Sequence, residues 1–257
     1  MIINNNISAI NTRNQLFNTN AAASKSMEKL SSGKRINRAA DDAAGLSISE
    51  KMRAQIRGLN QAARNAQDGI SLIQTAEGAL DEVSNMLVRL KELAVQKANG
   101  TYNDKDKENL SLEMTSLTTE IENIFNNTKF NGSQVLKSAA TIIISDNGTT
   151  SLVIDATVAT SITNLTSSSS VASIETAIEA VNRARATYGA KQNRLESTVR
   201  NLKTTAENLQ AAESRIRDTD MAEEMSNFTK YNILIQAGTA MLAQANMQPQ
   251  SVLSLLQ

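Results

Sequence analysis

The chain has 257 residues, with 26 basic and 26 acidic side chains, and it contains no histidine, cysteine or tryptophan. The lack of histidine and cysteine excludes a Ser-His-Asp triad, a Cys-His pair and thiolate or imidazole metal sites, and the even charge offers no broad basic field for nucleic acid. We therefore expect no enzymatic activity, catalytic residue, metal or cofactor. Aromatic residues make up only 3% and proline occurs once, which favours long helices over a thick globular core.

The first predicted element is an amphipathic helix over residues 5–32. Leu16, Ala23 and Leu30 repeat at sevens along it, and Gly33 is typical of a helix end. The residues before this helix lack both the basic region and the apolar region of a secretory signal, so we expect no cleaved signal peptide.

Two long heptad ladders predict the main body of the fold. Every seventh residue is apolar from Met52 to Ala94, inside a predicted helix from about Gly45 to Ala98. At 1.5 Å per residue, this helix would be roughly 80 Å long. A matching ladder runs from Ile174 to Ile216 without a miss. Two apolar seams of equal length are natural antiparallel or bundle partners, so we expect them to pack together.

Between the two ladders, the sequence predicts a third helix and a β-hairpin. Asn103 is a typical N-cap, and apolar residues follow at 4-3-4-3 spacing from Leu110 to Ile124. Farther along, the β-branched runs 141–145 and 151–155 flank a turn that contains Asn147-Gly148, which is a strong hairpin signal.

The last predicted helix carries too much apolar surface for one neighbour. An apolar or aromatic residue repeats at sevens as far as Pro249, and between Tyr231 and Met247 apolar residues occur on most faces with few charges. The repeating positions are Met221, Phe228, Ile235 and Leu242. Such a helix needs several partners, which indicates a subunit of a polymer.

The two ends of the chain differ in charge. Residues 1–40 carry six basic side chains against one acidic, whereas residues 218–257 carry four acidic side chains against one basic. Two interpretations are open: the charges are ordinary solvated faces, or the two ends attract each other.

Long motifs near both ends allow a comparison with known families. Leu30-Ser-Ser-Gly-Lys-Arg-Ile-Asn-Arg38 and Asp41-Asp-Ala-Ala-Gly-Leu46 lie near the start, and Ala212-Glu-Ser-Arg-Ile-Arg-Asp218 and Met241-Leu-Ala-Gln-Ala-Asn246 lie near the end. These motifs closely resemble those of bacterial flagellins, and the resemblance covers about residues 1–136 and 171–257.

The resemblance implies a mainly α fold with long antiparallel helices in a coiled-coil-like rod, one small β-hairpin, and terminal helices that form a filament core. Residues 1–40 and 218–257 would be the two halves of the inner core domain. Residues 41–172 would form the N-terminal part of the rod domain with the hairpin and an exposed loop, and residues 173–217 its C-terminal helix. The large outer domains that many flagellins carry are missing. We expect polymer core packing by Leu16, Leu30, Phe228, Ile235 and Leu242.

The function that the resemblance implies is that of a structural subunit which polymerises into the extracellular flagellar filament for motility. Its expected partners are other copies of itself, an export chaperone of the flagellar type III apparatus, the cap protein and the hook–filament junction proteins. A hook–filament junction protein, which shares similar ends, is the alternative. A membrane-anchored adhesin would need a run of about 18 apolar residues, and the sequence has none.

Two smaller surface sites are also predicted. Some flagellins are detected by a vertebrate toll-like receptor through the rod surface, and alignment of the neighbouring motifs places the contact residues at Arg89, Leu93 and Glu113. The alternative is that these residues are only rod surface and subunit contacts. In the Ser- and Thr-rich loop, the candidate O-glycosylation sites are Ser167, Ser168, Ser169 and Ser170, with a plain solvated loop as the alternative.

Overall fold

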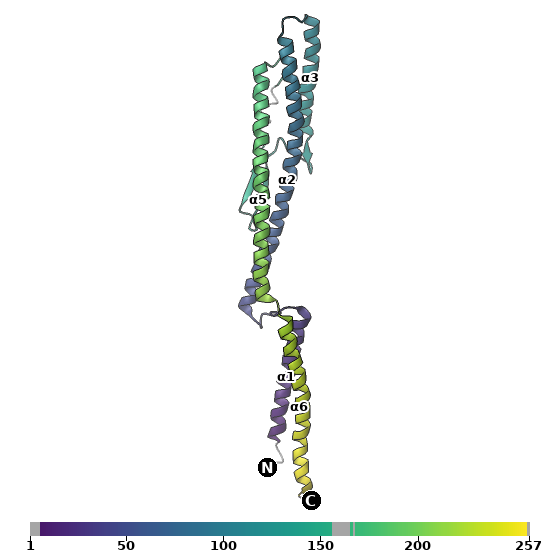
Figure 1. Ribbon diagram of the computed structural model, residues 1–257, viewed down its shortest axis with the longest axis vertical. Coiled ribbons are helices and arrows are strands. Elements are labelled where there is room, and N and C mark those ends of the chain that lie inside the picture. The colour runs from purple at the N-terminus through teal and green to yellow at the C-terminus, as the bar shows by residue number, and fades with distance from the viewer. Residues whose placement is uncertain (1–5, 156–164, 167, 256–257) are drawn as a thin grey trace. The chain divides into compact units, whose positions relative to one another are not determined.

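The structure, a computed structural model, describes residues 6–155, 165–166 and 168–255, with the backbone alone for residues 249–255. The chain divides into two compact units. Residues 1–53 and 209–257 form one, which we call the terminal unit, and residues 54–208 form the other, the central unit. Five long helices account for most of the described chain, which confirms the mainly α fold (Figure 1).

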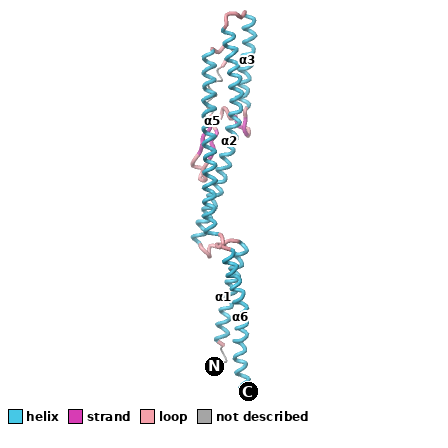
Figure 2. The backbone as a smooth tube through the Cα atoms, viewed as in Figure 1, coloured by secondary structure: helices cyan, strands magenta, loops and turns pink. Residues whose placement is uncertain are grey.

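The central unit contains α3 (Asp104–Asn127) and most of α2 (Ala43–Ala98) and α5 (Val171–Arg217), and these three helices lie side by side (Figures 1 and 2). Lys91 contacts Glu175 at 2.8 Å. Ten residues earlier on α2, Asp81 contacts Arg185 at 2.9 Å, ten residues later on α5. The two helices are therefore antiparallel, as the sequence predicts.

The two predicted heptad ladders form the core of this unit. Within residues 54–208 their large members are at most 8% exposed, which confirms that the seven-residue spacing marks the buried faces of α2 and α5 there. The ladder positions that are at most 1% exposed are Ala66, Ile73, Leu80, Leu87, Ile174, Val181, Tyr188 and Leu195.

The third helix begins where the sequence predicts. The Oδ1 atom of Asn103 accepts a hydrogen bond from the Asp106 N–H at 2.9 Å, which satisfies one of the free donors at the start of α3. Asp104 and Asp106 lie in the first turn, where a negative charge favours the helix dipole. Met114 and Ile121 from the predicted apolar face are buried against the core.

Two small antiparallel ladders complete the central unit (Figure 2). The predicted hairpin is confirmed as β3 (Ala140–Ile143) and β4 (Ser151–Ile154), in the register that pairs Ala140 with Ile154. A second ladder, β1 (Lys129–Phe130) with β2 (Ser133–Gln134), was not predicted. Strands of two residues are too short to show an alternating pattern, and only the Asn131-Gly132 turn between them could have indicated this ladder.

The β3–β4 hairpin is held between α2 and α5 through its outward-facing backbone carbonyls. The Asn65 side chain on α2 donates to the Ile143 carbonyl at 3.2 Å, and Lys191 on α5 donates to the Val153 carbonyl at 2.8 Å. Gly69 lets the strand approach α2, because a methyl group there would lie 2.2 Å from Cδ1 of Ile142. Each outer edge of the hairpin thus has a side-chain donor from a helix, which limits pairing with other strands.

In the terminal unit, α1 (Ile7–Ser32) lies antiparallel to α6 (Met221–Leu255). At one end of the pair, the Nδ2 atom of Asn6 donates to the Ala245 carbonyl at 2.7 Å, and at the other end Lys29 contacts Glu224 at 3.5 Å. Helix α6 continues past Pro249. Proline has no N–H that could donate to the carbonyl four residues earlier, which is that of Ala245. The Asn6 side chain donates to this carbonyl instead.

The segment after α1 is tied to the end of α5 within the same unit. The Arg35 N–H donates to the Arg217 carbonyl at 2.7 Å, and the Thr219 N–H donates to the Gly33 carbonyl at 3.1 Å. These bonds form a short antiparallel bridge between Lys34 and Asp218. Backbone pairing thereby fixes the segment that leaves α1 and the segment that enters α6 relative to each other.

Candidate functional site: the outer faces of the terminal helices

The seam between α1 and α6 is lined mainly by small side chains on the α1 side. Thr19, Ala23 and Ser26 are the buried residues of α1. Where α6 passes Leu16, it carries Gly238, and a methyl group at that glycine would lie 3.3 Å from Cδ1 of Leu16. Small residues let two helices approach closely and leave little room between them for large side chains.

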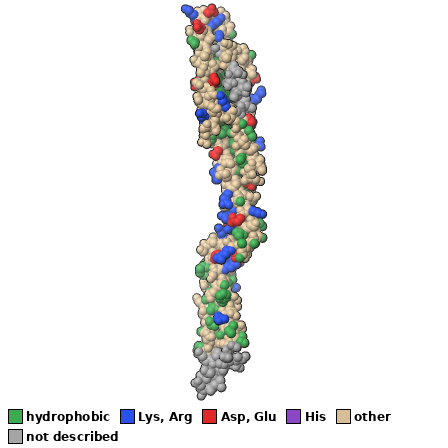
Figure 3. Space-filling model, turned by 180° about the vertical axis from the view of Figure 1, so that it is seen from behind, with side chains coloured by type: hydrophobic (Ala, Val, Ile, Leu, Met, Phe, Trp, Pro, Cys, Tyr) green, Lys and Arg blue, Asp and Glu red, His purple; other side chains and the backbone are tan. Residues whose placement is uncertain are grey.

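Many large apolar side chains of these helices lie outside the seam. Phe17 on α1 is 74% exposed and Ile233 on α6 is 60% exposed. On the face seen in Figure 3, hydrophobic side chains gather over the terminal helices with few charges among them. We call the exposed large apolar side chains of α1 and α6 together the outer apolar face, and they are Ile7, Ile10, Phe17, Met27, Met221, Met225, Ile233, Leu234, Met241 and Met247.

The five residues predicted for polymer core packing have a different position. All are half-buried, at seam spacing on α1 and α6, and none belongs to the outer apolar face. They are Leu16, Leu30, Phe228, Ile235 and Leu242. A seven-residue repeat marks the side of a helix that meets its intramolecular partner, so it selected the seam. Contact of these five residues with other copies stays a prediction.

Charged groups concentrate at one end of the terminal unit. After Glu224, α6 carries a single charged residue, Lys230, along its whole length. Near its start, Asp220 caps the helix by accepting hydrogen bonds from the N–H groups of Ala222 and Glu223. The Lys29–Glu224 contact joins a basic residue of the first segment to an acidic residue of the last, as expected if the two ends attract each other.

The loop after α1 is held by a carboxylate with an unusually acidic pKa. Lys25 contacts Asp41 at 2.8 Å, and the N–H groups of Asn37 and Arg38 donate to the same carboxylate. The hydrogen bond from Lys25 first, and the backbone donors after it, lower the pKa of Asp41 to about 2. A hydrogen bond from the buried Arg217 likewise lowers the pKa of Glu50. Asp41 holds the backbone of the loop in place and Glu50 pairs with the side chain of Arg217, so both roles are structural.

The predicted receptor residues do not form one exposed cluster. Arg89 pairs with Glu113 at 2.9 Å on the surface, and it also contacts Glu92 at 3.1 Å. Leu93, however, is 1% exposed and belongs to the core of the central unit. The prediction that Leu93 lies on the surface is therefore wrong for the free chain. Leu93 follows Leu90 by three residues and lies on the same buried side of α2.

Of the four candidate glycosylation sites, Ser167 lies outside the described residues. Ser168 is exposed. The Ser169 hydroxyl accepts a hydrogen bond from the Thr166 N–H at 2.8 Å, and the Ser170 hydroxyl accepts one from the Ser173 N–H at the start of α5. Local hydrogen bonds thus engage two of these hydroxyls, and Ser168 is the described serine best placed for modification.

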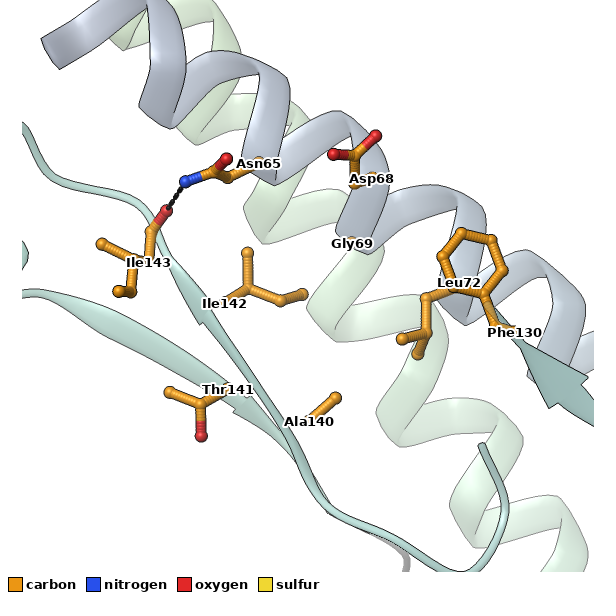
Figure 4. A pocket seen from close by; sticks show the side chains of 9 residues that line it. All are labelled: Asn65, Asp68, Gly69, Leu72, Phe130, Ala140, Thr141, Ile142 and Ile143. Carbon is orange, nitrogen blue, oxygen red and sulfur yellow. Dashed lines mark hydrogen bonds between the residues drawn. The ribbon is translucent and has the colours of Figure 1, made fainter. Parts of the chain in front are cut away.

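The central unit has a shallow depression of about 320 Å³ between α2, β1 and β3 (Figure 4). Leu72 and Phe130 form its apolar end, and the Asp68 carboxylate points away from the strands (Figure 4). With one carboxylate turned outward, its lining offers no acid–base pair and no nucleophile with a base. Over the described residues, no three acidic side chains gather to hold a metal ion, and no helix is apolar enough over a sufficient length to cross a membrane.

Comparison with known proteins gives matches at both ends of the chain. The profile of the bacterial flagellin N-terminal helical region matches residues 3–141, and that of the bacterial flagellin C-terminal helical region matches residues 171–256. A flagellin from Halalkalibacterium halodurans is 53% identical over the full length of both chains. A flagellar filament 31.3 kDa core protein of Treponema maltophilum and a flagellin of Bacillus subtilis are 46% and 47% identical, also over the full length of both chains. The chain belongs to the bacterial flagellin family.

Proposed function

We propose that this chain is the structural subunit of a bacterial flagellar filament, and that it polymerises through the outer apolar face for motility. The observation that carries the proposal is the apolar surface that the terminal helices leave uncovered. Among the described residues of α1 and α6, ten large apolar side chains stay exposed outside the intramolecular seam. Soluble monomers rarely expose so many large apolar residues on one pair of helices, and such patches mark contact surfaces.

Other copies of the same chain are the occupants that fit this face best. The face belongs to the segments that match the two flagellin helical regions, and similar proteins bear the name flagellar filament core protein. Few charges lie along α6 beyond Glu224, so a neighbouring helix can cover it without burying unpaired charges.

The role in this proposal is mechanical, without catalysis. Residues 1–40 and 218–257 form the inner core of the filament, and residues 41–172 and 173–217 form the rod around it. The subunit is exported through the flagellar type III apparatus with the help of a chaperone, and it adds beneath a cap protein outside the cell. The filament attaches to the hook through junction proteins. No observation favours the alternative of a junction protein.

The test is seeded assembly of the purified chain, followed by electron microscopy and sedimentation. The full chain should extend filament fragments. Chains that lack residues 1–30 or 230–257 should stay unassembled, while the helical signal of the central unit persists because residues 54–208 form their own compact core. Normal filaments from either shortened chain would show that the terminal helices are not the assembly surface.

A second, smaller proposal concerns the receptor. The surface ion pair of Arg89 with Glu113 supports a contact with a vertebrate toll-like receptor through these two residues, without Leu93. Arg89→Asp should then reduce receptor signalling by the monomer. The matched control is Arg64→Asp, also on an exposed part of α2. Equal signalling by the wild type and Arg89→Asp would refute this contact.

A further inference from the structure

Methionine is the only sulfur-containing side chain of this protein, and in the part of the chain that the structure describes its exposed copies are confined to the terminal helices. The chain has nine methionines and no cysteine. Among the described residues, five methionines are 48–61% exposed, and all five belong to the outer apolar face. In the central unit, Met114 is 1% exposed and Met86 is half-buried. The five exposed positions are Met27, Met221, Met225, Met241 and Met247.

This distribution places the readily oxidised atoms of the chain on its assembly surface. The thioether sulfur attacks one oxygen of a peroxide, and the O–O bond breaks. That oxygen becomes bound to sulfur, which is oxidised by two electrons, and the other oxygen leaves as water. The product, methionine sulfoxide, is a polar side chain that reductases convert back to methionine. A cysteine thiolate would normally compete for the oxidant, but this chain has none.

We propose that the five exposed methionines form a reversible oxidation site that controls whether a subunit can assemble. The free subunit presents their sulfur atoms to peroxide, whereas an assembled subunit has them covered by neighbouring copies. Peroxide therefore inactivates free subunits and spares assembled ones. The inference rests on the proposed function, because the sulfoxide is harmful only if another copy must cover this face.

The size of the effect follows from the polarity of the sulfoxide oxygen. Burying a polar group without a hydrogen-bond partner costs enough free energy to change an equilibrium constant by at least about tenfold. A subunit with sulfoxides on the outer apolar face should therefore require at least about tenfold more protein for assembly. Leucine is close to methionine in volume and apolar character but cannot form a sulfoxide, so a Met→Leu variant is compared with itself before and after peroxide treatment.

The experiment treats free full-length chain with hydrogen peroxide, removes the peroxide and measures the critical concentration on untreated filament seeds. Two variants are compared with the wild type. One carries Leu at the five exposed positions, and the matched control carries Met52→Leu, Met86→Leu and Met114→Leu. Peptide mass mapping locates the sulfoxides, and treatment with the two methionine sulfoxide reductases tests reversal.

The inference predicts that the oxidised wild type and the control variant lose assembly, that the reductases restore it, and that the variant with five leucines stays unaffected. A second prediction needs no variant. When a partly oxidised wild-type sample assembles, the chains that stay unassembled should carry more sulfoxide at the five positions than the chains in filaments. Equal loss in the variant with five leucines, or normal assembly of wild type oxidised at all five positions, would overturn it. Failure of the untreated chain to extend seeds would overturn the proposed function itself.

Discussion

Replacing Phe17 with alanine should weaken assembly strongly and leave the free subunit intact. Phe17 is 74% exposed, more than any other large apolar side chain of the described residues. A phenylalanine buries about 150–250 Å² when it is fully covered, so roughly 150 Å² of Phe17 remains for a neighbouring copy to cover. At about 25 cal/mol per Å², this area corresponds to about 3–4 kcal/mol.

Alanine retains a small part of that area, so the expected loss is about 2–3 kcal/mol for each added subunit. Such a loss raises the critical concentration roughly 30- to 140-fold, since every 1.4 kcal/mol is about tenfold. The thermal stability of the free chain should change by less than about 0.5 kcal/mol, because the side chain is exposed there.

Seeded assembly followed by sedimentation gives the critical concentration, and thermal unfolding followed by circular dichroism gives the stability of the free chain. The control is Asn18→Ala, which changes an exposed polar residue next to Phe17 and removes no apolar area. If Phe17→Ala assembles at the wild-type critical concentration, neighbouring copies do not cover this residue, and the assignment of the outer apolar face fails.

Three further changes test the contacts within each unit. Asn6→Ala should weaken the α1–α6 pair by about 1–2 kcal/mol, because α1 loses its N-cap and the Ala245 carbonyl loses its donor. Pro249→Ala supplies an N–H four residues after Ala245, so it should recover part of this loss. The critical concentrations of the two single variants and the double variant measure the recovery. Asp41 has a folded-state pKa below its ordinary 3.8, so it stabilises the loop above that pH, and the stabilisation disappears as the pH falls towards about 2. Amide exchange in residues 33–42 should show this acid loss in the wild type and not in Asp41→Asn. Lys191→Met should lower the free energy of unfolding of the central unit by about 1 kcal/mol in urea, because the Val153 carbonyl loses its donor, whereas Lys203→Met on the same helix should not.

The long helices could be predicted because their seams repeat in the sequence with a fixed period. Positions such as Leu80 and Val181 are buried because residues seven apart return to nearly the same side of a helix, and that side faces the partner. The hairpin was likewise predictable from a local signal, the Asn147-Gly148 turn between β-branched runs. Both signals depend only on residues close together in the chain.

The contacts that define the candidate site depend on residues far apart in the chain. No local pattern indicates that Asn6 meets Ala245, or that Gly238 passes closely by Leu16. The period also cannot distinguish an intramolecular seam from a surface that meets other copies, which is why the predicted core residues lie on the seam. Leu93 was assigned to the surface by alignment, although its spacing from Leu90 already favoured the core.

The most direct test is a cryo-electron microscopy structure of the filament assembled from this chain, in which the exposure of Phe17 and Ile233 is measured. In the free chain these side chains are 74% and 60% exposed. The account predicts that side chains of neighbouring copies cover both almost completely. A filament held together by the central units, with Phe17 and Ile233 still open to solvent, would contradict it.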